Sequence, residues 1–398
     1  MTLTEAPPRA VPPQNAPAPT GQSALFDLLA RSWSLDAPIR AVALDRQGKA
    51  AAFALADGRI ALMALEDEES ALSRMRVEAD SGRSTIRPRG KPVAQPILTP
   101  ALAEGAPLLA VSGLIGFIAA SADGRLHRVT PRGQIIALTD RRDPIFAIAS
   151  DQAGRLALAR ADRVDLHAEE GMVRQADLAT PDPATALAFA PGDGTLAVMS
   201  AAGLRLFSLG KMPEERPESL PLGGRGALVF SGDGHWLAGA NGQDGIWLLS
   251  RADGRIARIG KFRAPPASLA FAATQTANTA TPTAGGAVFA SGAFRAAGWA
   301  LATPPFESET TGALKTGRPG LVLIEQIAAH PRRDLIAIGT ADGAVTLARV
   351  GQSADMPLRQ ADGSAVTALC WSADGLHLVI GTASGQAALV TLPEQIFK

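Results

Sequence analysis

Residues 185–209 read TALAFAPGDGTLAVMSAAGLRLFSL. Three apolar runs follow one another here, separated by the turns Pro191-Gly-Asp-Gly194 and Ala202-Gly203. Glycine supplies the positive φ angles that tight turns between antiparallel strands require. The segment therefore predicts a meander of three short antiparallel strands.

The second of these turns recurs along the chain and measures the length of a repeat. Its occurrences begin at Asp57, Asp123, Asp162, Ala202, Asp244, Asp342 and Ser384. The intervals are 66, 39, 40, 42, 98 and 42 residues, so the period is near 40. The longest interval fits two units plus an insertion, because Gly286–Ser291 and Ala297–Leu301 are strand-like runs. We therefore favour eight units, with seven as the alternative if 286–301 is one long insertion.

The repeating unit cannot bury both faces of its own small sheet. Successive sheets must stack on one another until a ring closes. The predicted fold is thus an all-β, single β-propeller over residues 23–398. We expect Ala30–Leu35 to close the ring as an outer strand paired with Ala387–Thr391. The preceding run, Leu25–Leu29, fits a turn of helix beside the ring equally well.

The units resemble WD40 repeats over roughly residues 31–392. The best matches are Val366-Thr-Ala-Leu-Cys-Trp-Ser-Ala-Asp-Gly375 with Leu378-Val-Ile-Gly-Thr382, and Leu335-Ile-Ala-Ile-Gly-Thr-Ala-Asp-Gly-Ala-Val-Thr-Leu347. The family's Trp-Asp and Gly-His dipeptides are missing: Met63-Ala64 and Ala348-Arg349 stand where Trp-Asp is expected. The family's tetrad of Asp, His, Ser or Thr and Trp therefore cannot form, and stability must come chiefly from apolar packing between sheets.

Composition excludes several classes of protein. The 398 residues carry 38 basic and 38 acidic side chains, and this neutrality disfavours nucleic-acid or membrane-surface binding. The longest uncharged stretch, Ala106–Ser121, is shorter than the roughly 20 residues of a membrane span.

One cysteine, Cys370, and no secretory signal favour the cytosol. Arginine outnumbers lysine strongly, which favours a bacterial source. Residues 1–22 are rich in Pro and Ala, and we expect a disordered tail.

Insertions are expected at about residues 66–96, 273–285 and 304–320. In this strand order all three leave the same face of the ring, while the opposite face is expected to keep tight turns. Loops on a rigid scaffold commonly carry function. The elaborated face is therefore the predicted surface for partners.

The first insertion contains a block of acidic residues, 66–69, followed by cations. These cations are the candidate partner-binding residues: Arg74, Arg76, Arg83, Arg87, Arg89 and Lys91. Arginine holds carboxylates and phosphates through paired hydrogen bonds, which would suit an acidic partner. The alternative is a solvated, partly disordered loop whose opposite charges neutralise each other.

No catalytic or metal-binding motif stands out in the sequence. The five histidines fall in five different units, and His330 alone ends an innermost strand near the expected channel. Cys370 lies in an apolar run typical of a buried thiol. We predict no catalytic residue, metal or cofactor, and a protein-protein interaction scaffold. The alternative is a small-ligand or metal-dependent hydrolase or lyase acting at the central channel. RNA binding through the arginine-rich loop is disfavoured.

Overall fold

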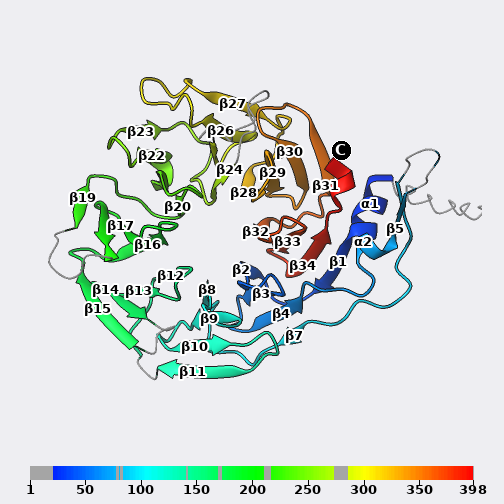
Figure 1. Cartoon of the computed structure of the whole chain (residues 1–398), viewed down its shortest axis with the longest axis horizontal. Coiled ribbons are helices and arrows are strands. Elements are labelled where there is room, and N and C mark those ends of the chain that lie inside the picture. Colours follow the sequence, from blue (N-terminus) through cyan, green and yellow to red (C-terminus); the bar gives the residue numbers. More distant parts are fainter. Residues whose placement is uncertain are drawn as a thin grey trace, which may run out of the picture.

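The computed structural model describes residues 21–77, 80, 84–139, 142–168, 173–209, 217–272 and 286–397. Within them, eight four-stranded antiparallel sheets are arranged in a ring around a central axis (Figure 1). Each sheet is one blade, and its first strand lies innermost. The predicted all-β propeller with eight blades is confirmed. The unit expected at 286–301 is blade 6, and the insertion expected at 273–285 lies outside the described residues.

The blades follow one another in chain order. Blade 1 consists of β2 (Ile39–Leu44), β3 (Ala50–Leu55), β4 (Ile60–Ala64) and β7 (Ile97–Leu98). Blade 2 consists of β8 (Leu108–Val111), β9 (Phe117–Ala120), β10 (Leu126–Val129) and β11 (Ile135–Thr139). Blades 3 and 4 are β12 (Ala147–Ser150), β13 (Leu156–Ala159), β14 (Arg163–Ala168) and β15 (Val173–Ala179), then β16 (Ala184–Phe189), β17 (Thr195–Ser200), β18 (Leu204–Ser208) and β19 (Glu218–Leu220).

The second half of the ring repeats this pattern. Blades 5 and 6 are β20 (Leu228–Phe230), β21 (Trp236–Ala240), β22 (Ile246–Ser250) and β23 (Ile256–Ile259), then β24 (Leu269–Ala272), β25 (Ala287–Ala290), β26 (Ala296–Ala300) and β27 (Ala313–Thr316). Blade 7 is β28 (Ile324–Ala329), β29 (Leu335–Thr340), β30 (Val345–Arg349) and β31 (Asp355–Arg359). Blade 8 takes β32 (Val366–Trp371), β33 (His377–Thr382) and β34 (Gln386–Thr391) from the C-terminal end.

The ring closes through strand β1 (Ala30–Ser34), which is the outer strand of blade 8. It pairs antiparallel with β34, with Ala30 opposite Val390 and Ser34 opposite Gln386. The predicted closing strand is therefore confirmed. Helix α1 (Gly21–Leu29) directly precedes β1 and packs beside β31. The helical turn expected at Leu25–Leu29 and the closing strand expected at Ala30–Leu35 thus occur one after the other.

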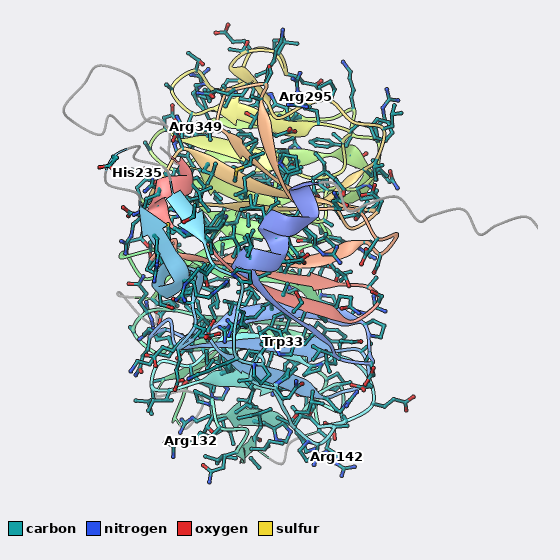
Figure 2. All side chains as sticks on the ribbon, turned by 90° about the vertical axis from the view of Figure 1, so that its right-hand side faces the viewer. Trp33, Arg132, Arg142, His235, Arg295 and Arg349 are labelled. Carbon is teal, nitrogen blue, oxygen red and sulfur yellow. The ribbon has the colours of Figure 1, made fainter. Side chains whose placement is uncertain are left out.

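The two faces of the ring differ in the connections that they carry. Connections between first and second strands, and between third and fourth strands, leave one side, which we call the arm face. Figure 2 shows Arg132, His235 and Arg349 on this side, and Arg142 and Arg295 on the other. The opposite face does not keep only tight turns as expected, because the connections 99–107 and 260–268 leave from it. The range 304–320, expected as an insertion, contains β27, so the connection before it is 301–312.

Apolar packing between blades forms the core. The second strands β3, β17, β25, β29 and β33 are buried along almost their whole length. One cluster joins blades 8 and 1 through Trp33, Ile39, Phe53, Val379 and Leu389. Each large side chain buried in this way contributes about 1.5–3 kcal/mol to stability. Every blade therefore depends on its neighbours for its stability.

Ionic links join the turns between second and third strands to the connections that enter the blades. In blade 1, Arg59 Nε lies 2.7 Å from the Asp57 carboxylate, and Arg59 Nη2 donates to Leu35 O at 3.3 Å. The arginine thus ties the turn between β3 and β4 to the connection that enters the blade. Blade 2 repeats the arrangement with Asp123, Arg125 and Leu102.

Blade 3 holds a version of this link in which Arg160 and Asp165 are buried, while Arg163 and Asp143 are partly exposed. Arg160 donates to Asp165 and to Asp143 O, and Arg163 donates to Asp165 at 2.9 Å and to the Asp143 carboxylate at 2.6 Å. Burial by itself would raise the pKa of Asp165, but the hydrogen bond and charge of Arg160 hold that pKa below its usual range. In this network the buried charges of Arg160 and Asp165 satisfy one another.

Close approach of neighbouring blades requires glycine at two positions. A Cβ on Gly381 of β33 would lie 2.6 Å from Ile39 Cγ2 of blade 1. A Cβ on Gly339 of β29 would lie 2.6 Å from Val366 Cγ1 of blade 8. Both contacts bring a second strand against the start of the next innermost strand. The spacing of blades 7, 8 and 1 therefore depends on glycine, which has no side chain, at these two positions.

We predict that Gly381→Ala destabilises the ring, because the added methyl overlaps the branched side chain of Ile39. Overpacking of this kind costs about 1–3 kcal/mol. Gly232→Ala is the matched control, since a Cβ there meets nothing within 4 Å. Urea unfolding followed by circular dichroism measures both variants. Equal midpoints for Gly381→Ala and the wild type would contradict the close stacking.

Candidate interaction surface

The arm, residues 66–96 between β4 and β7, is the largest connection on the arm face. Its described part contains the short helix α2 (Ala71–Arg74) and the hairpin of β5 (Met75–Val77) and β6 (Ser84–Ile86). Ser70 caps α2, and its side chain accepts a hydrogen bond from Ser73 N at 3.2 Å. Figure 1 shows this unit beside α1, outside the ring.

The acidic end of the arm binds the closing strand of the ring. Arg31 of β1 is buried, and its Nη2 donates to Ala64 O and Leu65 O, both at 2.8 Å. The Asp67 carboxylate lies 3.8 Å from Arg31 Nε and also accepts two hydrogen bonds from Arg89. Asp67 therefore sits between two arginines from distant parts of the sequence.

Two further contacts join the arm to the N-terminal elements. The buried Arg74 guanidinium donates to Leu28 O at the end of α1 and to Arg87 O within the arm. Trp33 Nε1 of β1 donates to Ala94 O at 2.9 Å. The arm thus holds α1 and β1 at several points along their length. We call this set of contacts the clasp.

The clasp separates the predicted partner-binding cations into groups. Arg74 and Arg89 point inward and are occupied by the contacts above. Lys91 is exposed and pairs with Glu68 at 2.8 Å. Arg76 and Arg87 are exposed and make no ion pair within the part of the arm that the structure describes. Arg83 lies outside the described residues. The block therefore presents two exposed guanidiniums rather than a continuous cationic surface.

An aromatic stack forms the rim of the arm face at blades 5 and 6. The Phe306 ring stacks on Trp236, with centroids 6.1 Å apart and planes inclined by 25°. The Arg255 guanidinium lies 4.1 Å from the centroid of Phe306, in a cation–π arrangement. The stack joins the connection 301–312 to the neighbouring blade. It gives the rim a rigid, partly apolar surface.

Residues with potential for catalysis are engaged in structural contacts. His330 packs on Trp371 with ring centroids 4.8 Å apart, and its Nδ1 accepts from Arg332 N at 3.0 Å. Its Nε2 therefore carries the hydrogen and donates to Gly375 O at 3.1 Å. The ring links blades 7 and 8, and both ring nitrogens have partners within the protein. Burial raises the pKa of the Cys370 thiol to about 11, so the reactive thiolate is scarce at neutral pH.

Several aspartates of the tight turns, including Asp57 and Asp123, bond to their own turns. Asp342 accepts from Thr340 Oγ1 at 2.6 Å and from Ala344 N at 3.3 Å. Among the described residues, no group of three or more His, Cys, Asp or Glu side chains is placed to hold a metal ion. A hydrolase or lyase at the channel would need such a cluster, or another set of converging polar groups. Across the described ranges, no helix has the length and apolar character needed to cross a membrane.

Comparisons with known proteins agree with this geometry. A family model described as the anaphase-promoting complex subunit 4 WD40 domain matches residues 328–395, from the end of β28 in blade 7 through β34 in blade 8. The C-terminal WD40 domain of Sif2 superposes with a TM-score of 0.60 at 13% identity, covering 92% of this chain and 99% of that one. The chain has the β-propeller fold of WD40 domains.

Two other structures share the fold of this WD40-like propeller. The computationally designed Ika8 protein superposes with a TM-score of 0.59 at 16% identity, covering 90% of this chain and 98% of its own. A chain of the Mitotic Checkpoint Complex gives 0.54 at 14% identity, covering 72% and 86%. No curated protein sequence matches. At these identities the likeness concerns the fold alone.

Little in the sequence of this WD40-like propeller indicated which residues contact one another in the clasp. Arg31 and Trp33 were recognised as part of a closing strand, but nothing in the run indicated their partners. Asp67 and Arg89 are 22 residues apart, and no periodicity relates them. Their pairing depends on how the arm folds back over β1.

We predict that Asp67→Asn weakens the clasp, because buried Arg31 and partly buried Arg89 lose their shared carboxylate. The free energy of unfolding at pH 7 falls by about 1.5–3 kcal/mol. Glu68→Gln is the matched control, since its pair with Lys91 is exposed and contributes little. Chemical denaturation of both variants and the wild type measures the difference. Equal losses for both variants would refute a structural role for Asp67.

The effect of Asp67→Asn also depends on pH. Burial alone would raise the pKa of Asp67, but the hydrogen bond from Arg89 and the charge of Arg31 hold that pKa below its usual range. A depressed carboxyl pKa stabilises the fold above the unfolded pKa of about 4 and loses this effect as the pH falls through the folded pKa. The stability gap between wild type and variant should therefore narrow below about pH 4. Denaturation at several pH values checks this trend.

Proposed function

We propose that this WD40-like propeller is a non-catalytic scaffold that holds one or more proteins on its arm face. The observation that carries the proposal is the concentration of elaborated, ordered structure on that one face: the arm, its exposed arginines and the aromatic rim. The ring beneath is rigid, because its blades stack through fully buried strands. A rigid scaffold binds with little ordering cost.

The exposed cations of the arm define the chemistry of the contact. Arg76 and Arg87 offer guanidiniums that can bind carboxylates through paired hydrogen bonds. The Arg255, Phe306 and Trp236 stack adds residue types that are enriched at binding hot spots. We propose a partner with carboxylates facing the arm and an apolar patch facing the rim.

Similar folds and composition support the wider setting of this proposal. One structure of the same fold is a chain of the Mitotic Checkpoint Complex. The neutral charge of the present chain supports proteins rather than nucleic acid as partners. A single cysteine supports a cytosolic site of action, and the arginine-rich composition supports a bacterial source.

Affinity purification tests the scaffold proposal. The tagged full chain, added to lysate of its source, should retain a specific protein that mass spectrometry identifies. Arg76→Glu combined with Arg87→Glu should lower its recovery about tenfold or more, because both contacts become repulsive. The matched control is Arg225→Glu combined with Arg263→Glu, two exposed arginines on the opposite face.

Two outcomes would contradict the proposal at different levels. Recovery of no specific protein by the folded wild-type chain would count against the scaffold function itself. Equal recovery by the arm variant and by the control would remove the arm from the interface. Circular dichroism of each variant establishes that the ring remains folded.

A further inference from the structure

A cavity of about 860 Å³ opens at the arm-face mouth of the central channel. Innermost strands and turns of blades 1 to 4 and of blade 8 form its walls. The apolar side chains of the wall include Leu44, Leu109, Val111, Ile148, Phe189 and Trp371. Ligand sites in proteins are typically concave and mostly apolar, with volumes of about 300–1,000 Å³. The mouth therefore has the size and lining of a binding site.

An exposed apolar lip extends this surface beyond the cavity. Leu114 and Ile115 lie in the turn between β8 and β9, with 64% and 54% of their surface exposed. The turn is closed by the hydrogen bond from Ser112 N to Gly116 O at 3.1 Å. Gly116 has a φ of 82°, and a Cβ there would lie 2.3 Å from Val129 O. The lip is thus a fixed part of the ring.

Arg46 places a positive charge between the lip and the cavity. Its Nη1 donates to Gly113 O at 3.4 Å, next to the lip, and its Nη2 donates to Asp151 O at 2.7 Å. Both acceptors are neutral backbone carbonyls. A guanidinium has five N–H donors, so donors remain for a ligand. The Arg46 side chain is exposed at this position.

The other charged groups that line the cavity are engaged elsewhere. The Asp45 carboxylate is buried and accepts hydrogen bonds from Lys49 N and Ala50 N. The Asp151 carboxylate pairs with Arg155 at 2.5 Å. Of the four charged side chains in the lining, Arg46 is therefore the exposed one, and it forms no ion pair with a described residue.

We infer that this mouth binds a polypeptide segment in which a large apolar side chain lies next to a carboxylate. The apolar side chain enters the cavity, and the carboxylate accepts hydrogen bonds from Arg46. A segment of chain fits better than a small free acid, because an acid that fills the cavity leaves Leu114 and Ile115 uncovered. The inference deepens the proposed scaffold function and rests on it, but it concerns a surface separate from the arm.

Fluorescence anisotropy with defined peptides tests this inference on the full chain. The probe is the fluorescein-labelled peptide Gly-Ser-Gly-Leu-Phe with a free C-terminal carboxylate. It should bind saturably, and the same peptide with a C-terminal amide should bind about tenfold or more weakly. Replacing Leu-Phe by Ser-Ser in the peptide should abolish binding. Equal binding of acid and amide would overturn the role of the carboxylate.

Variants of the protein locate the site. Arg46→Ala should weaken binding of the acid peptide to the level of the amide. Arg40→Ala is the matched control, because Arg40 is exposed on the same strand, β2, at the opposite mouth of the channel. Leu114→Ser combined with Ile115→Ser should weaken acid and amide peptides alike. Unchanged affinity in the Arg46 variant would overturn the inference.

A competition experiment separates a polypeptide from a small acid. Decanoate should compete weakly with the acid peptide; if it binds more tightly than the peptide, the site is for a free acid and the inference is wrong.

Peptide binding and recovery from lysate are independent readouts. If the peptides fail while a specific protein is still recovered, the inference at the mouth falls and the scaffold proposal stands. If peptide binding depends on Arg46 while no protein is recovered, the scaffold proposal loses its support.

Discussion

Each blade of this protein has two apolar faces and can bury them only against the blades on either side. Phe53 of β3 shows the consequence, because it is fully buried in a cluster that it shares with Val379 and Leu389 of blade 8. Removing a neighbour would expose such side chains to water. The ring must therefore close, and its last sheet must be completed by a strand from the other end of the sequence.

The closing strand contributes few backbone pairs, and the clasp adds side-chain contacts to them. Arg31, Trp33 and the end of α1 each bind a different part of the arm. Since a buried guanidinium is costly without partners, Arg31 strongly favours the folded arm over a loose one. The arm thus serves ring closure as well as offering exposed cations. These two roles of the arm explain why its block of charged residues lies beside the strand that closes the ring.

The sequence predicted the fold well because turns and apolar runs are local signals. The recurring Asp-Gly turns fixed the period, and the blades expected at 286–301 and at the ring junction are present. The roles of single charged residues were predicted less well. Arg74 and Arg89 were expected to face a partner, yet they bind carbonyls and Asp67 inside the arm. His330 was placed near the channel, but its ring lies between blades 7 and 8.

These differences have one physical origin. A turn or a strand depends on residues close in sequence, whereas the partner of a charge depends on the folded path of distant segments. Likewise, the mouth of the channel draws its lining from five blades, and no single run of sequence contains it. Arg46 and the Leu114–Ile115 lip acquire their relation only when the ring has closed.

Deleting residues 1–35 and measuring amide hydrogen exchange around the ring tests closure most directly. Strand β17 lies in blade 4, far from the deletion, and is buried in the native ring. If closure supports all blades, amide protection in β17 should fall together with that in β34. Native protection of β17 after the deletion would show that the blades are stable without a closed ring, and would contradict this account.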